Sequence, residues 1–221
     1  MNRPIRIALT KGRLEEKSVS MFEQLGYDCS SVRNKGRKLI LPIPEANLEV
    51  VLAKAADVAT YVENGVCDLG ILGKDTILEM GGTFYEVADL GFGRCRFALA
   101  VPQGMDFYAG YHTRCIASKY VNVTKSVFER KNMDVKIVKI EGSVELAPIL
   151  GLSDAIVDIV ETGTTLRENG LMVAEYLTEV SARLIVNIAS LKLHKAEIEP
   201  LINQIEAFIN REGKRDGACK S

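Results

Sequence analysis

The sequence is poor in the residues that most often hold metals or form disulfides. It has two histidines, five cysteines and no tryptophan among 221 residues. The cysteines lie far apart in the chain, at Cys29, Cys67, Cys95, Cys115 and Cys219. They form no CxxC pair and no disulfide framework, so we predict reduced thiols. With only His112 and His194, a histidine-based metal site is poorly supplied.

Long apolar runs and an excess of one charge are also missing. The first apolar run, Ile5 to Leu9, is interrupted by Arg6. No stretch is long enough for a signal peptide or a membrane span, so we expect a cytoplasmic protein that does not bind membranes. Lysine and arginine total 28 against 29 aspartate and glutamate, a net charge of -1. This balance gives no reason to expect nucleic acid as a partner, and a polyanion site would have to be local.

The common nucleotide-binding and hydrolase motifs are absent as well. The chain has no GxGxxG, GxSxG or HExxH pattern. Gly73-Lys74 is not a Walker A motif, because Asp68 replaces the first glycine and Asp75 replaces the serine or threonine. A bound nucleotide would therefore be held by a different loop.

Short apolar runs alternate with longer segments of helical period, which predicts an α/β protein with mainly parallel strands. The predicted strands are 5–9, 38–41, 48–52, 68–72, 97–101, 135–140, 155–160 and 182–186. The predicted helices are 14–25, 57–63, 74–80, 124–130, 144–149, 170–177 and 198–209. Asp57 is expected to cap the second helix, and the polar tail 211–221 is expected to fray. No linker or repeat separates the halves, and the pattern favours two lobes that share a cleft.

The strongest local signal is the segment 153–171, SDAIVDIVETGTTLRENGL. An apolar strand runs into Glu161-Thr162-Gly163-Thr164-Thr165, and a helix opens at Leu166. Consecutive backbone N–H groups, threonine hydroxyls and the positive end of the helix would form a cradle for a phosphate monoester. Asp158 and Glu161 suit sugar hydroxyls or a divalent cation, so the combination points to a phosphorylated ribose. The alternative is a strand followed by an ordinary threonine-capped helix.

A second candidate segment, Thr10-Lys11-Gly12-Arg13-Leu14, follows the first predicted strand. Ligands of open α/β sheets bind beyond the carboxyl ends of strands. Gly12 would let the backbone approach a ligand, while Lys11 and Arg13 supply positive charge. Further cations could come from Arg37, Lys54, Arg94 or Arg96. The alternative is a solvated basic turn.

A third segment, Glu141-Gly142-Ser143-Val144-Glu145-Leu146, also joins a strand to a helix. Gly142 could leave backbone amides open to a ligand. Capping of the helix by Ser143 is the favoured interpretation of this pattern alone.

Six segments together carry a family resemblance. They are TKGRL (10–14), YVENGVCDLGILGKD (61–75), GRCRFALAVP (93–102), IASKY (116–120), EGSVELAPILGLSDAIVDIVETGTTLRENGL (141–171) and SARLIVN (181–187). In this order they closely resemble the ATP phosphoribosyltransferase of histidine biosynthesis, and the resemblance extends from Ile5 to about Phe208.

The resemblance implies a fold and a reaction. The fold is α/β and two-lobed, of the type II periplasmic-binding-protein kind, with the active site in the interlobe cleft. The first lobe would take 1–92 and 177–221, and the second lobe 93–176. The enzyme would be a pentosyltransferase in which N1 of the ATP adenine displaces pyrophosphate from C1′ of phosphoribosyl pyrophosphate. Mg²⁺ would be held mainly by the substrate phosphates.

The resemblance also bears on partners. The chain ends soon after the predicted helix 198–209, so it resembles the short form of the family, which lacks a carboxyl-terminal regulatory domain. Short-form members need a regulatory subunit similar to histidyl-tRNA synthetase, which implies a hetero-octamer of four catalytic and four regulatory chains. Two alternatives remain: a non-catalytic solute-binding protein of the same fold, and a phosphoribosyltransferase for another base.

Residue roles follow from the matched segments. The phosphoribosyl pyrophosphate site would consist of Asp158, Glu161, Thr162, Gly163, Thr164 and Thr165, with the two acids on the ribose hydroxyls. The cations expected around the pyrophosphate are Lys11, Arg13, Arg37 and Lys54. Many relatives carry arginine in place of Lys54, and lysine lacks the bidentate geometry of arginine. The residues expected to contact ATP are Gly12, Leu14, Arg94, Glu141, Gly142 and Ser143.

Overall fold

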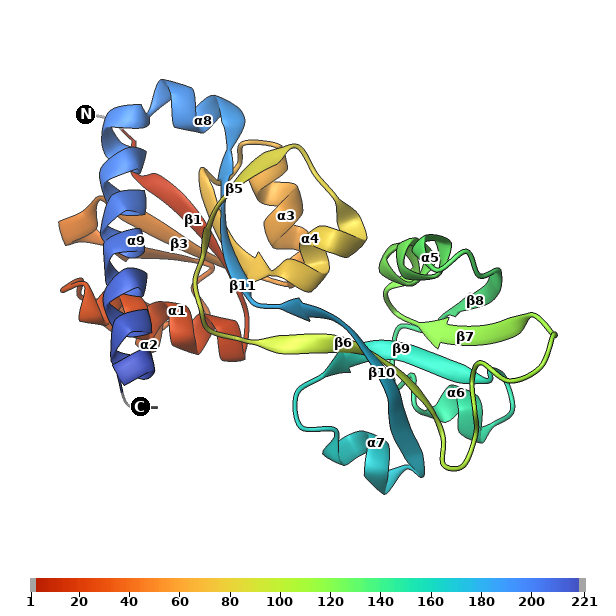
Figure 1. Ribbon diagram of the computed structural model, residues 1–221. Coiled ribbons are helices and arrows are strands. Elements are labelled where there is room, and N and C mark those ends of the chain that lie inside the picture. The colour runs from red at the N-terminus through yellow and green to blue at the C-terminus, as the bar shows by residue number, and fades with distance from the viewer. Residues whose placement is uncertain (1–2, 219–221) are drawn as a thin grey trace. The chain divides into compact units, whose positions relative to one another are not determined.

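Two units, each built on its own β-sheet, make up the chain (Figure 1). The computed structural model describes residues 3–218. Unit 1 comprises Met1–Gly93 and Ser181–Ser221, and unit 2 comprises Arg94–Val180. The chain thus passes between the units twice, at 93/94 and at 180/181, whereas the family resemblance implies 92/93 and 176/177.

Unit 1 contains a six-stranded sheet in the order β2-β3-β1-β4-β11-β5. Its strands are β1 (Ile5–Thr10), β2 (Ile40–Ile43), β3 (Leu48–Ala53), β4 (Leu69–Gly73), β5 (Phe84–Asp89) and β11 (Ala182–Asn187). β1 runs parallel to β3 and β4, whereas β11 runs antiparallel to β4 and β5, and β2 runs antiparallel to β3. The helices are α1 (Arg13–Gln24), α2 (Ser30–Arg33), η1 (Pro44–Ala46), α3 (Ala55–Glu63), α4 (Lys74–Met80), α8 (Ile188–Leu193) and α9 (Lys195–Ala218).

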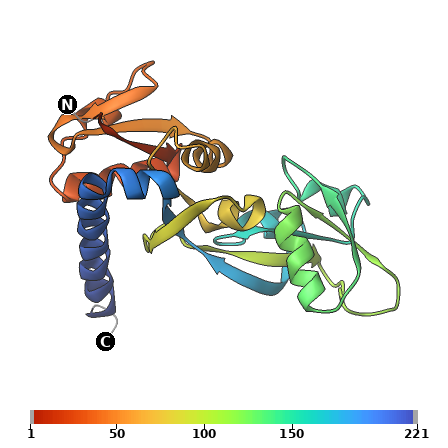
Figure 2. The same ribbon diagram turned by 90° about the horizontal axis from the view of Figure 1, so that it is seen from above.

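Helices cover both faces of this sheet, which explains the nearly continuous apolar sequence of β1. Ile7 and Leu9 of β1 share a buried cluster with residues of α1 and α9. Ala8, whose side chain points to the opposite face, belongs to a second cluster with α3. Figure 2 shows the bend between α8 and α9, after which α9 continues as a long helix.

Unit 2 contains a five-stranded sheet in the order β10-β6-β9-β7-β8. Its strands are β6 (Cys95–Pro102), β7 (Arg114–Ser118), β8 (Val135–Lys139), β9 (Ala155–Val160) and β10 (Leu171–Val180). β7 is parallel to β8 and β9, whereas β6 is antiparallel to β9 and β10. The helices are α5 (Val121–Arg130), α6 (Leu146–Ile149) and α7 (Thr164–Glu168). α5 packs on one face of the sheet, and α6 and α7 pack on the other.

One predicted helix is wrong. Residues 171–177 of the segment predicted as helix 170–177 form the first part of β10, a ten-residue strand that pairs with β6 from Leu171 to Val180. Its residues favour a helix by intrinsic preference, but pairing with β6 overrides that preference. Gly170, with φ of 71°, separates this strand from α7.

Other elements differ from the sequence pattern in extent. β5 and β7 were not predicted, because the first is largely exposed and the second has only three apolar residues, Cys115–Ala117, between Arg114 and Ser118. Asp57 lies in the first turn of α3, whose N-cap is Lys54. The helix expected to end at 209 continues as α9 into the segment expected to fray. Cys219 lies outside the described residues, and none of the described cysteines forms a disulfide. No helix in the described part of the chain is long and apolar enough to cross a membrane.

Candidate functional site

The segment after β9 places the predicted anion-binding residues at the end of a central strand. β9 lies between β6 and β7, and Ile156 and Val157 are buried on its two faces. Only residues 161–163 separate β9 from α7, and Gly163 has φ of 71°. This left-handed conformation favours glycine, and it turns the strand directly into the helix. We refer to residues 161–165 as the anion loop.

The anion loop lines a cavity of about 270 Å³ within unit 2. The wall of this cavity consists of Glu145, Asp158, Ile159, Val160, Glu161, Thr162, Gly163, Thr164, Thr165 and Leu166. The structure therefore brings together all six residues predicted for the phosphoribosyl pyrophosphate site. It adds Glu145, which the sequence analysis did not select because only the packing of α6 beside β9 reveals its position.

The polar groups of this wall suit different parts of one ligand. Backbone N–H groups and threonine hydroxyls can donate hydrogen bonds to phosphate oxygens. The carboxylates of Asp158, Glu161 and Glu145 can accept hydrogen bonds from hydroxyl groups. α7 has only five residues, so its aligned peptide dipoles add little to anion binding. The backbone amides and threonine hydroxyls of the loop must therefore supply most of the binding energy for an anion.

Hydrogen bonds within the loop hold its two central threonines together. The Thr162 and Thr164 hydroxyl oxygens lie 3.1 Å apart, and the Thr164 amide donates to Thr162 Oγ1 at 3.4 Å. Arg167 donates to the Thr162 carbonyl and to Thr164 Oγ1, at 3.3 and 3.2 Å. The sequence analysis did not select Arg167. The sequence did contain a signal for this contact, because residues three positions apart on a helix, such as Thr164 and Arg167, lie side by side.

The third candidate segment contributes less than expected to this cavity. Glu141, Gly142 and Ser143 are exposed, and they are not part of the cavity wall described above. The hydrogen bond from Lys139 at 2.7 Å lowers the pKa of Glu141. The interpretation of Ser143 as a helix cap is wrong. α6 begins at Leu146 with Glu145 at its N-cap position and has no side-chain cap, because the chain makes a turn at 143–146 first.

Positively charged residues follow three neighbouring parallel strands of unit 1. Thr10 of β1 is paired in register with Ala53 of β3, so Lys11 and Lys54 follow adjacent strand ends. The Lys11 amide donates to the Ala53 carbonyl at 2.9 Å, which fixes this arrangement. β4, on the other side of β1, is followed at once by Lys74. Sequence analysis had assigned Lys54 but not Lys74, which pairs with Glu86.

The basic turn between β1 and α1 has the geometry expected of it. Lys11, Gly12 and Arg13 are exposed, and Gly12 has φ of 91°. Apart from its neighbours along the chain, no described residue has an atom within 4 Å of a Cβ added at Gly12, so this backbone is open on that side. The Leu14 side chain, in contrast, packs on the core of unit 1 and would lie 2.7 Å from a Cβ added at Gly93.

Arg37 and Arg94, the other cations predicted for the site, do not directly follow β1, β3 or β4 in the chain. Arg37 is exposed in the segment between α2 and β2. Arg94 is exposed and is the first residue of unit 2, directly before β6. Their roles in pyrophosphate and ATP contacts stay predictions.

The acidic residues of the site do not form a metal-binding cluster. Among the described residues, no group of three or more histidine, cysteine, aspartate or glutamate side chains could hold a metal ion. The carboxylates in the cavity wall are nevertheless oxygen donors of the kind Mg²⁺ uses. Mg²⁺ commonly takes one or two carboxylates, several waters and substrate phosphates, and these residues fit that mode.

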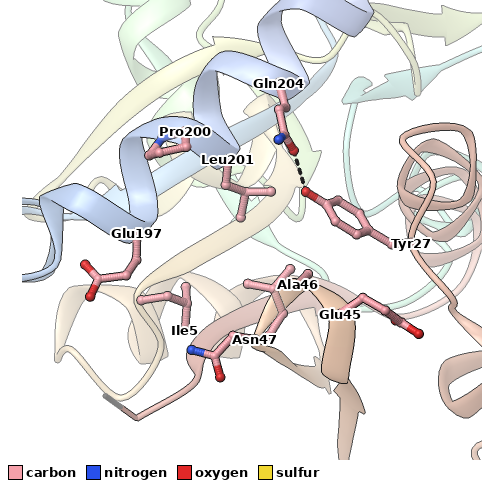
Figure 3. A pocket seen from close by; sticks show the side chains of 10 residues that line it. Ile5, Tyr27, Glu45, Ala46, Asn47, Glu197, Pro200, Leu201 and Gln204 are labelled. Atoms are coloured by element: carbon pink, nitrogen blue, oxygen red, sulfur yellow. Dashed lines mark hydrogen bonds between the residues drawn. The ribbon is translucent and has the colours of Figure 1, made fainter. Parts of the chain in front are cut away.

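A larger cavity of about 380 Å³ lies elsewhere in unit 1, between η1 and α9 (Figure 3). The Tyr27 hydroxyl donates to Gln204 Oε1 at its edge. Glu45 and Glu197 are the charged residues of its wall, and none of the predicted site residues lines it. Cavity size alone therefore does not select the candidate site.

The sequence of the chain matches one enzyme family over most of its length. A family model described as ATP phosphoribosyltransferase matches residues 54–207. The ATP phosphoribosyltransferase of Clostridium kluyveri is 59% identical over 208 residues, covering 94% of this chain and 95% of the relative. That of Clostridium acetobutylicum is 54% identical over 211 residues, covering 96% of this chain and 98% of the relative.

Solved structures agree with this match. The ATP phosphoribosyl transferase (HisG:HisZ) complex from Thermotoga maritima gives a TM-score of 0.79 at 30% identity, covering 94% of this chain and 99% of that chain. The periplasmic aliphatic sulphonate binding protein SsuA from Escherichia coli gives a TM-score of 0.60 at 13% identity, covering 98% and 76%. The second likeness shows the fold alone and confirms the predicted α/β fold of the type II periplasmic-binding-protein kind. From identity over nearly its full length, the chain belongs to the ATP phosphoribosyltransferase family.

Proposed function

We propose that this chain transfers the phosphoribosyl group of phosphoribosyl pyrophosphate to N1 of the ATP adenine, releasing pyrophosphate. One observation carries the proposal: a single cavity combines a loop of amides and threonine hydroxyls with three carboxylates. A site that bound phosphate alone would have no use for the carboxylates. A ribose phosphate uses both kinds of group. Family membership then specifies the reaction as the first step of histidine biosynthesis.

Within the cavity, the two kinds of group divide the ligand between them. The amides and hydroxyls of Thr162, Gly163, Thr164 and Thr165 bind the 5′-phosphate. Asp158 and Glu161 accept hydrogen bonds from the ribose hydroxyls. This arrangement fixes the ribose, and it places negative charge near C1′ as positive charge develops there in the transition state.

The basic residues of unit 1 serve the leaving group. Lys11, Arg13, Lys54 and Arg37 bind the pyrophosphate, whose negative charge rises as the bond to C1′ breaks. The positive φ of Gly12 lets its backbone come close to a phosphate oxygen. Arg94, Leu14 and the segment 141–143 contact ATP in this proposal.

The reaction needs alignment more than proton transfer. N1 of neutral adenine has a lone pair and can attack C1′ without first losing a proton. Catalysis then consists of holding N1, C1′ and the departing oxygen in line while cations neutralise the pyrophosphate. The two histidines have no necessary role in this scheme.

Mg²⁺ is held mainly by the substrate phosphates. When bound, it neutralises phosphate charge and favours departure of the pyrophosphate. Among the protein groups of the site, the carboxylates of Asp158 and Glu161 are the oxygen ligands of the type that Mg²⁺ prefers. Their part is to hold the ribose hydroxyls and any metal-bound water beside them.

The chain works with a regulatory partner in the cytoplasm. The Thermotoga maritima relative is known as a complex of two different chains, HisG and HisZ. By this likeness, the present chain is the catalytic subunit of a hetero-octamer with a regulatory subunit similar to histidyl-tRNA synthetase.

The direct test measures pyrophosphate release from ATP, phosphoribosyl pyrophosphate and Mg²⁺, with and without the regulatory subunit. We expect release that requires all three small molecules. Absence of pyrophosphate release in both mixtures would contradict the proposal. Binding of the substrates without pyrophosphate release would favour the solute-binding alternative. Release with a free base in place of ATP would favour a phosphoribosyltransferase for another base.

A further inference from the structure

Arg167 is a cation at the anion loop that the proposed function leaves unused. Its guanidinium donates through Nη1 to the Thr162 carbonyl and through Nη2 to Thr164 Oγ1. It reaches two points of the loop at once, from α7. The residue is not part of the cavity wall, which ends at Leu166. It therefore contacts the loop from outside the cavity.

The contact with the carbonyl has a consequence for the neighbouring amide. In a trans peptide unit, the C=O and the N–H point in opposite directions within one plane. The Thr162 carbonyl shares its peptide unit with the Gly163 amide. When Arg167 holds this carbonyl, it fixes the plane and turns the Gly163 N–H away from the guanidinium. A Cβ added at Gly163 would lie only 3.6 Å from Arg167 Nη1, which shows how closely the two approach.

The contact with Thr164 orders the hydroxyl groups in the same way. A guanidinium only donates, so Thr164 Oγ1 accepts from Arg167. The Thr164 proton is then available to Thr162 Oγ1 at 3.1 Å, and Thr162 Oγ1 also accepts from the Thr164 amide. The Thr162 proton is left as a donor for an incoming anion. Either hydroxyl can donate in the contact between Thr162 and Thr164, and donation from Thr164 to Thr162 is compatible with the contact to Arg167.

We propose that Arg167 is a positioning residue that aims the anion loop, turning its Gly163 amide and Thr162 hydroxyl toward a phosphate monoester. This inference rests on the proposed function, since it assigns the loop to the 5′-phosphate. Arg167 acts through the loop and makes no contact with the phosphate. The contrasting interpretation is an exposed arginine that contributes only long-range charge, which salt would screen.

The test is calorimetric binding of ribose 5-phosphate to the full chain and to three variants. Arg167→Gln removes the charge and the two-point contact, whereas Arg167→Lys keeps the charge but cannot make both hydrogen bonds in the same geometry. Arg130→Gln is the matched control, because Arg130 is also exposed in unit 2 and donates to a backbone carbonyl, that of Ser126. Melting temperatures of all variants verify that each is folded.

We expect both Arg167 variants to bind ribose 5-phosphate more weakly, by about tenfold for glutamine, and the control to bind normally. The loss should persist between about 0.05 M and about 0.5 M salt, because short hydrogen bonds are screened little. In turnover with the regulatory subunit, KM for phosphoribosyl pyrophosphate should rise while KM for ATP stays the same.

Two results would overturn the positioning role alone: normal binding by folded Arg167→Gln, or full rescue by Arg167→Lys with a loss that disappears in salt. Failure of the unaltered chain to bind ribose 5-phosphate would overturn both this role and the assigned phosphate site. Binding by the unaltered chain together with pyrophosphate release keeps the proposed function intact whatever the variants show.

Discussion

A single buried carboxylate, Asp68, ties three segments of unit 1 together. Its Oδ2 accepts from Arg3 and from the Arg6 amide, both at 2.8 Å. Its Oδ1 accepts from Arg3 and from the Ser190 hydroxyl, both at 2.7 Å. Burial opposes the Asp68 charge, but these four hydrogen bonds outweigh it, so the pKa of Asp68 lies below its ordinary value.

We expect Asp68→Asn to lower the free energy of unfolding near pH 7 by about 1–3 kcal/mol. Asparagine has one oxygen, so its amide group would face two of the four donors. Because the folded pKa is depressed, the charge stabilises the fold above the ordinary pKa, and this stability is lost as pH falls through the folded value. Urea unfolding of both proteins at several pH values measures the difference.

This difference should shrink as pH falls from about 5 toward about 3. Asp134→Asn, at an exposed position of unit 2, is the control and should change stability little. A gap between Asp68→Asn and the unaltered protein that stays constant with pH would show that the charge is not responsible.

Thr165 offers a test of the site with little effect on the fold. Its side chain is exposed in the cavity wall, and its carbonyl accepts from the amide and the side chain of Asn169, at 3.2 and 2.8 Å. We expect Thr165→Ala to raise KM for phosphoribosyl pyrophosphate by about tenfold through loss of one hydrogen bond to a charged group. Steady-state kinetics beside a thermal melt measure both effects. Thr113→Ala, exposed in another loop of unit 2, should change neither, and an unaltered KM in Thr165→Ala would remove this hydroxyl from the site.

Residues of the site were predictable where they are neighbours in sequence. Asp158 and the anion loop belong to one strand and one turn, so their spacing alone placed them together. Glu145 reaches the same cavity only because α6 packs beside β9. Lys11 and Lys54 become neighbours only through the register of β1 with β3. Long-range pairing of this kind leaves no local signal.

At the scale of elements, the contact between α3 and β4 depends on a residue without a side chain. A Cβ added at Gly70 would lie 2.8 Å from Val62 Cγ2 and 2.9 Å from Val58 Cγ1, both on α3. It would also lie 3.2 Å from Ile185 Cγ1 on β11. All three side chains are buried, so none can move aside easily.

We therefore expect Gly70→Ala to lower the free energy of unfolding by about 1–3 kcal/mol through overpacking. Chemical denaturation measures this loss. Addition of Val62→Ala should recover part of it, so the double variant should lose less than the sum of the single losses. Gly142→Ala is the stability control, because no described residue other than its neighbours along the chain has an atom within 4 Å of the added Cβ. Strict additivity of the two losses would rule out the proposed contact.

Strands and helices were predictable where the apolar pattern decides between them. β9 is buried along most of its length and was predicted with its observed bounds. β10 lies at the edge of its sheet, and although its burial alternates from Leu171 to Leu177, its sequence begins with four consecutive apolar residues and does not alternate. Its composition allowed a helix, and only pairing with β6 makes it a strand. β5 is an edge strand of unit 1 and is largely exposed. Its sequence has no apolar run from which a strand could be predicted.

At the scale of the whole molecule, the two units differ in whether their strands come from one segment of the chain or from two. Unit 2 takes all five strands from one continuous segment, 94–180. Unit 1 takes β11 from the far end of the chain and inserts it between β4 and β5. The buried cluster of unit 1 also includes Leu184, Val186 and residues of α9. The segment 1–93 alone therefore lacks an interior strand and a covering helix.

We predict that a fragment of residues 94–180 folds on its own, whereas a fragment of residues 1–93 does not. Far-UV circular dichroism and cooperative unfolding in urea distinguish the two outcomes. A chain that joins 1–93 to 181–221 through a flexible linker should regain cooperative unfolding, because it restores β11 and α9. Cooperative folding of 1–93 by itself would contradict the importance of β11.

The insertion of β11 also sets an order of events during synthesis. When β4 and β5 leave the ribosome, the strand that joins them has not yet been made. At about 5–20 residues per second, the ribosome needs on the order of ten seconds more to reach it. During that interval all of unit 2 emerges and can fold, while two strand edges of unit 1 wait unpaired. Those edges are open to pairing with other nascent chains, so newly made protein depends on chaperones most before residues 182–221, which begin with β11, appear.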